Sequence, residues 1–193
     1  NIFNKLNKQD FSSYKYIIYG FTPNDLFDLV DGSSIKDGTV SIVKKLLLST
    51  ATSKFLLHNL MRLDKVYLDL YLSRQPYAGY LESPLSGKYE NAIDIAFSQL
   101  SELENNIKRK LIIVLLPQRA EVVAMRLGLY KNDFQEYVIR SCKSCGLYCF
   151  VTDVGPLSKI DESHFPVDGH LTVQGNDIVG RQLGGFLKTL RLN

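Results

Sequence analysis

The stretch Leu111-Ile112-Ile113-Val114-Leu115-Leu116 decides the fold, because it is apolar at every position and ends at Pro117-Gln118. Continuous apolarity over a run of this length, without alternation, is typical of a central parallel strand that is covered on both faces. Two other runs share this character, Tyr16-Ile17-Ile18-Tyr19-Gly20-Phe21 and Gly146-Leu147-Tyr148-Cys149-Phe150-Val151. We therefore predict three buried parallel strands, at 16–21, 111–116 and 146–151.

Helical patterns alternate with these strands. Apolar residues at mixed spacings of three and four predict helices over 49–72, 89–107, 133–144 and 171–190. Strands that alternate with helices form a parallel sheet with helices on both faces, so we predict a three-layer α/β/α sandwich. We treat residues 1–193 as one domain. The segment 31–87 is longer than one crossover helix requires, so we expect a helical insertion, either a lid over a site or extra length in one layer.

The composition is that of a folded domain. With 45% hydrophobic residues and a formal net charge of only +3 at pH 7, wholesale disorder is excluded, and nothing argues for nucleic acid or a membrane surface as a partner. No apolar run is long enough to span a membrane, and no signal peptide is visible near Asn1. Because both methionines, Met61 and Met125, are internal, we expect a processed product or a fragment whose targeting segment lies upstream.

Motifs for several other chemistries are absent, including the dinucleotide, P-loop, zincin and nucleophile-elbow signatures. Cys142, Cys145, Cys149 and His164 are residue types that bind zinc. However, Cys149 lies in a predicted buried strand, and buried free cysteine is common, so we predict no metal. Unpaired cysteines suit a reducing cytoplasm. His58 lies in a helical apolar stripe and is predicted to be a surface or packing histidine.

A polar turn, Thr22-Pro23-Asn24-Asp25, follows the first predicted strand. Ligands of parallel α/β sheets gather at the carboxyl ends of the strands, so this turn lies where chemistry is expected. Asn24 can donate an amide N–H to a developing oxyanion, an interaction worth about 3–4 kcal/mol. The alternative is that Asn24 and Asp25 form a turn that caps the next helix.

The segment from His164 to Gly175 joins a loop to the last predicted helix. Within it, Asp168 and His170 are close enough in sequence for the carboxylate to orient the imidazole as a general base. The alternative is a loop in which Asp168 caps the final helix.

Together, Pro23-Asn24-Asp25 and Asp168-Gly169-His170-Leu171, followed by Gly175 before a C-terminal helix, resemble the SGNH (GDSL-type) hydrolases. These are serine esterases and acyltransferases on a flavodoxin-like α/β/α fold, which need no metal or organic cofactor. The resemblance implies one role for each matching residue: His170 as general base, Asp168 as its orienting carboxylate, Asn24 as an oxyanion-hole donor and Asp25 as a supporting residue.

Two positions depart from the family pattern. Thr22 replaces the glycine of Gly-x-Asn-Asp, and one residue rather than two separates Asp168 from His170, as in the branch that acetylates bacterial exopolysaccharides. The family's nucleophile lies in a Gly-Asp-Ser that follows the first strand, and this sequence contains no such tripeptide. We therefore expect the serine, the second-block glycine and the first strands of the sheet to lie upstream of Asn1.

The resemblance predicts a serine ester hydrolase or acyltransferase that acts on an acyl ester, such as an acetyl group on a carbohydrate, in the cytoplasm or the bacterial envelope. A second class stays open, a non-catalytic α/β domain that binds a carbohydrate or a protein partner. In that class Tyr67, Tyr71, Tyr77 and Tyr80 would stack on sugar rings, whereas packing in the core is the alternative. Neither prediction includes nucleic acid or a membrane segment in this chain.

Overall fold

The predicted parallel sheet is confirmed. The computed structural model describes residues 11–26, 51–74, 78–153, 160–166 and 170–190. Within them the sheet contains β1 (Tyr16–Phe21), β2 (Lys110–Leu115) and β3 (Tyr148–Val151), in the order β1-β2-β3. Both pairs of strands are parallel.

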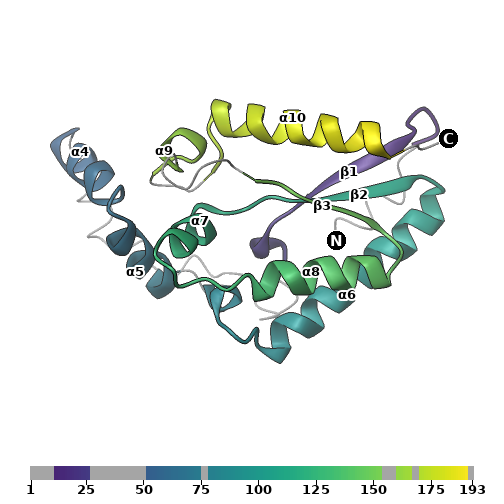
Figure 1. Cartoon of the computed structure of the whole chain (residues 1–193), viewed down its shortest axis with the longest axis horizontal. Coiled ribbons are helices and arrows are strands. Elements are labelled where there is room, and N and C mark those ends of the chain that lie inside the picture. Colours follow the sequence, from purple (N-terminus) through teal and green to yellow (C-terminus); the bar gives the residue numbers. More distant parts are fainter. Residues whose placement is uncertain (1–10, 27–50, 75–77, 154–159, 167–169, 191–193) are drawn as a thin grey trace.

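Helices cover both faces of the sheet, which gives the expected α/β/α arrangement (Figure 1). On one face lie α6 (Gly87–Ile107) and α8 (Asp133–Ser144), and on the other lies α10 (Val173–Thr189). The remaining described helices gather at the carboxyl ends of the strands: η1 (Pro23–Leu26), α4 (Ala51–Leu60), α5 (Asp64–Arg74), η2 (Ala78–Leu81), α7 (Arg119–Arg126) and α9 (Ile160–Ser163).

The main core lies between the sheet and the α6–α8 layer. Leu111, Ile113 and Leu115 of β2 belong to this core, together with Phe97 of α6 and Phe134 of α8. The side chains between them on β2 alternate to the opposite face, and every residue from Leu111 to Leu115 is at most 4% exposed. The unbroken apolar run of β2 is thus covered on both faces, as the sequence predicts.

The prediction that all three strands are covered on both faces is wrong for β1. β1 and β3 form the two edges of the described sheet, and Ile18 of β1 is 44% exposed. α10 lies over β3, where the rings of Phe150 and Phe186 stack with their centroids 4.8 Å apart. An apolar run alone does not distinguish an edge strand from a central one, because the local sequence does not show which strands and helices lie beside it.

The predicted helices at 89–107 and 133–144 are confirmed as α6 and α8, and the one at 171–190 is confirmed as the slightly shorter α10. The predicted helix over 49–72 is wrong, because it is divided into α4 and α5. At the break, the carbonyl of Met61 accepts a hydrogen bond from Arg119 of α7, and Asp64 forms an ion pair with Arg126. These tertiary contacts override the local helical pattern.

A second apolar cluster joins α5 to α7. Tyr67 and Leu68 of α5 pack with Ala120 and Val123 of α7, next to Ile160 of α9. These contacts account for part of the expected insertion at 31–87. Its residues 31–50 and 75–77 lie outside the described residues, and the lid role stays a prediction.

Candidate active site

The turn after β1 is closed by Asp25. Thr22 precedes η1, and the Asp25 carboxylate accepts a hydrogen bond from the Thr22 amide at 2.8 Å and another from the Thr22 hydroxyl at 3.3 Å. A carboxylate three residues into a helix that accepts the N-cap amide is half of a capping box, and Pro23 occupies the favoured first helical position. Partial burial raises the pKa of Asp25, and the two hydrogen bonds from Thr22 oppose this shift. Both of these hydrogen bonds of Asp25 lie within its own turn. Burial raises the pKa of Tyr19 on β1, and the charge of Asp25 adds to this shift.

Asn24 lies in the same turn, at the carboxyl end of β1. The orientation of its side chain is outside what the structure describes, so its role as an oxyanion donor stays a prediction. The backbone places η1, which contains Asn24, directly after β1 and in contact with α6.

His170 lies in a segment that we call the 164–171 hairpin after its two paired ends, 164–166 and 170–171, which are the parts that the structure describes. The backbone of His164 forms an antiparallel bridge with Leu171, and the Phe165 amide donates to the His170 carbonyl at 2.8 Å. His170 itself is exposed. Asp168 lies outside the described residues, so its distance to His170 is not part of the structure.

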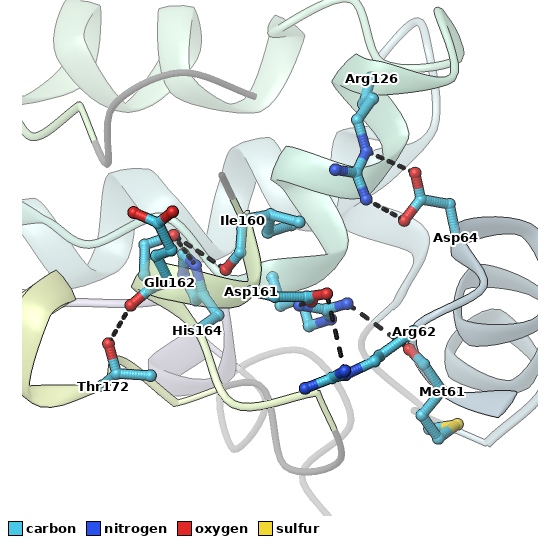
Figure 2. Close-up of polar contacts among 11 residues, drawn as sticks. Met61, Arg62, Asp64, Arg126, Ile160, Asp161, Glu162, His164 and Thr172 are labelled. Atoms are coloured by element: carbon cyan, nitrogen blue, oxygen red, sulfur yellow. Dashed lines mark hydrogen bonds and ion pairs between the residues drawn. The ribbon is translucent and has the colours of Figure 1, made fainter. Parts of the chain in front are cut away.

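The final helix is capped by Thr172 rather than by Asp168, so the alternative role considered for Asp168 is wrong. The Thr172 hydroxyl accepts from the Gly175 amide at 3.1 Å and donates to the carbonyl of Glu162. The Thr172 amide donates to the Ser163 carbonyl at 2.9 Å. α9 and the first turn of α10 are thus bonded to each other (Figure 2).

Gly175 makes this contact between α9 and α10 possible. A Cβ at this position would lie 2.2 Å from the carbonyl oxygen of Ser163, closer than any real contact. Gly175 is part of the family resemblance, and packing explains why this chain has a glycine there. Only a residue without a side chain lets α10 begin in contact with α9.

Asp161 of α9 forms an ion pair with the fully buried Arg119, with Nη1 and Oδ1 2.7 Å apart. The Arg119 guanidinium also lies 5.0 Å from the ring centroid of Tyr67. Arg62, between α4 and α5, is 4.0 Å from the same carboxylate. α9 is in this way connected to α7 and to the α4–α5 junction.

Ser163 and His164 are neighbours in a buried pair. The Ser163 hydroxyl lies 3.0 Å from His164 Nδ1, a distance typical of a nucleophile and its base. Yet Ser163 is 2% exposed and its hydroxyl also lies 3.1 Å from the Ile160 carbonyl, while His164 is fully buried. A substrate cannot reach this pair, so its role is structural.

A small cavity lies beside the Pro23 turn, at the carboxyl ends of β1 and β2. Its volume is about 10 Å³, close to the least space that holds one water molecule. Phe21, Pro23 and Pro117 line it together with the buried Glu121 and with Gln135. Burial raises the pKa of Glu121 to about 7, although hydrogen bonds from Gln118, Gln135 and Tyr130 favour the charged form. The cavity is too small for an ester substrate.

The cysteines differ from the prediction. Cys142 and Cys149 form a disulfide, with their Cα atoms 6.3 Å apart, and Cys145 is free. The prediction of three unpaired cysteines is wrong because the end of α8 lies beside β3, and the argument for a reducing compartment loses its basis. Among the described residues, no group of histidine, cysteine and acidic side chains suits a metal ion.

The tyrosines proposed to stack on sugars pack in the interior where the structure describes them. Tyr67 is 4% exposed, Tyr80 is fully buried, and the Tyr71 hydroxyl donates to Gln118 at 2.7 Å. Tyr77 lies outside the described residues.

His58, on α4, is half-buried. None of the helices in the described part of the chain is long and apolar enough to cross a membrane.

No family model matches this chain, and no curated protein and no solved structure matches it either.

Sequence reasoning missed the polar residues that connect the helices at the carboxyl ends of the strands. α7 was not predicted, although Gln118-Arg119-Ala120-Glu121 has the spacing of a capping box, which Gln118 and Glu121 form. That signal, directly after a strand, would have found the helix. No comparable signal marks Arg119 or His164, because their partners are distant in sequence.

Proposed function

We propose that this chain is part of a serine ester hydrolase or acyltransferase of the SGNH type, acting on an acyl ester such as an acetyl group on a carbohydrate. One observation carries the proposal. The 164–171 hairpin, with an exposed His170, is bonded to the carboxyl end of β2, and the Asn24 turn follows the neighbouring strand β1. Parallel α/β sheets bind their ligands at this edge.

In the proposed reaction, a serine hydroxyl attacks the acyl carbon while His170 accepts its proton, and Asn24 donates to the oxyanion that forms. His170 then returns the proton to the leaving alcohol. Water, or the hydroxyl of an acceptor, attacks the acyl-enzyme with His170 again as base, which releases the serine. Asp168 orients the imidazole throughout. The printed sequence contains no Gly-Asp-Ser, so the proposal requires a serine from a segment outside it.

The first test is to sequence the gene upstream of the codon for Asn1. A reading frame that encodes an apolar strand followed by Gly-Asp-Ser supports the proposal. A frame in which another residue replaces that serine contradicts it.

The second test measures hydrolysis of p-nitrophenyl acetate by the full-length product. His170→Ala should lower kcat by several orders of magnitude, and Asn24→Ala should lower it about a hundredfold or more. His58→Ala, on α4, is the matched histidine control and should leave kcat unchanged. Unchanged turnover in His170→Ala would exclude His170 as the base, and carbohydrate binding that survives this substitution would instead favour a non-catalytic domain.

A further inference from the structure

A fully buried side chain, His164, connects the 164–171 hairpin to the sheet. Its Nε2 lies 3.1 Å from the carbonyl oxygen of Pro117, the second residue after β2. Its Nδ1 lies 3.0 Å from the Ser163 hydroxyl. Both ring nitrogens therefore have partners, and neither is directed at solvent.

These partners fix the tautomer of the ring. A carbonyl can only accept, so Nε2 of the neutral ring carries the proton and Nδ1 does not. The one hydrogen of the Ser163 hydroxyl is shared between two acceptors within reach, His164 Nδ1 and the Ile160 carbonyl. Burial lowers the pKa of His164; the bond to Pro117 opposes this shift, and the positive charge of Arg119 adds to it. The ring is thus neutral at pH 7, with one N–H directed at the end of β2.

The backbone around His164 carries this connection to His170. His164 is bridged to Leu171, the residue after His170, and the Phe165 amide bonds to the His170 carbonyl at 2.8 Å. On the other side, Ser163 accepts from the Thr172 amide and lies against Gly175. A displacement of His164 relative to β2 therefore displaces the backbone of His170.

We propose that His164 is a positioning residue, which holds His170 at the carboxyl end of β2 through the hydrogen bond from Nε2 to the Pro117 carbonyl. This inference rests on the proposed function, in which His170 is the general base. His164 does not touch substrate, because it is fully buried. Catalysis is sensitive to such placement, since a shift of about 1 Å in a catalytic group can cost about a hundredfold in rate.

Two substitutions distinguish the effect of the hydrogen bond to Pro117 from the effect of the volume that the His164 ring fills. His164→Gln keeps an N–H donor that can reach Pro117, whereas His164→Leu fills similar space without a donor. His58→Leu on α4 is the matched control. Each variant is examined by hydrogen exchange of the Phe165 and Thr172 amides, which needs no enzymatic activity, and by ester hydrolysis in the full-length product.

We expect both amides to exchange faster in His164→Leu and at nearly the wild-type rate in His164→Gln and His58→Leu. We also expect kcat to fall about a hundredfold in His164→Leu with KM little changed, and to recover largely in His164→Gln.

The outcomes distinguish this inference from the proposed function. Unchanged exchange in a folded His164→Leu overturns the anchoring role, whatever the activity. Equal loss of kcat in the Gln and Leu variants overturns the role of the Nε2 bond. Wild-type protein without esterase activity overturns the proposed function and with it the positioning of a base, even where the exchange data support the anchor.

Discussion

The α6–α8 layer and the corner formed by α7, α9 and α10 are held together by different forces. In the layer, apolar side chains from α6, α8 and the sheet form one continuous cluster. In the corner, polar contacts connect the elements: Arg119 to Asp161, His164 to Pro117, and Thr172 to Glu162. Of these side chains, Arg119 and His164 are fully buried. Apolar burial is not directional, whereas hydrogen bonds require defined distances and angles. The layer thus supplies stability, and the corner supplies the orientation of the hairpin that carries His170.

The largest expected effect belongs to the layer. Phe97 of α6 is fully buried, with its ring centroid 5.4 Å from that of Phe21. Phe97→Ala should lower the free energy of unfolding by about 3–5 kcal/mol, because it removes apolar burial and leaves a cavity. Urea denaturation followed by circular dichroism measures this loss. A loss below about 1 kcal/mol would mean that the layer is not the main source of stability.

Gly175→Ala tests the close contact in the corner. The added Cβ would collide with the Ser163 carbonyl, so the first turn of α10 must move away from α9, at a cost of about 2 kcal/mol. Gly180→Ala, in the same helix, is the control. Its Cβ would meet no atom within 4 Å, so it should stabilise the protein by about 0.5–1 kcal/mol. Equal effects in urea denaturation would contradict the α9–α10 contact.

Asp161→Asn tests the ion pair of the corner. Arg119 is fully buried, but the Asp161 side chain is 40% exposed, so the loss should be about 1–2 kcal/mol, less than for a fully buried pair. The control is Asp177→Asn, which breaks a surface pair with Arg181 and should cost less than about 0.5 kcal/mol. If the two substitutions cost the same in thermal denaturation, the Arg119 pair contributes no more than a surface pair.

The pH dependence of stability tests Glu121. Burial raises the pKa of Glu121 in the folded protein to about 7, above the ordinary value of 4.5. The contribution of Glu121 to the free energy of unfolding is therefore fully present below pH 4.5, and it is lost as the pH rises through about 7. The slope is at most about 1.4 kcal/mol per pH unit. Glu121→Gln should remove this slope between those pH values in urea denaturation. A slope that is unchanged in the variant would show that other groups cause it.

The same comparison explains what the sequence could predict. β2, α6 and α8 follow from local apolar patterns, because β2 is covered on both faces and each of the two helices turns one apolar face to the core. The polar contacts of Arg119, His164 and Met61 do not, because the partners of these residues are far away in the chain. The pairing of Cys142 with Cys149 likewise depends on how α8 ends against β3. The roles of His170 and Asn24 come from the family resemblance and from their places beside predicted strands and helices, and they stay predictions.

The central claim is that Asn24 and His170 lie together at the carboxyl ends of the strands, and cross-linking tests it most directly. Asn24→Cys and His170→Cys are combined in a Cys145→Ser background, which removes the free native thiol, and treated with a short bismaleimide. The control combines Asn24→Cys with His58→Cys on α4. The account predicts an intramolecular cross-link in the 24/170 pair and none in the 24/58 pair. If both cysteines of the 24/170 pair react with a monofunctional maleimide but do not cross-link, the two segments do not form one site.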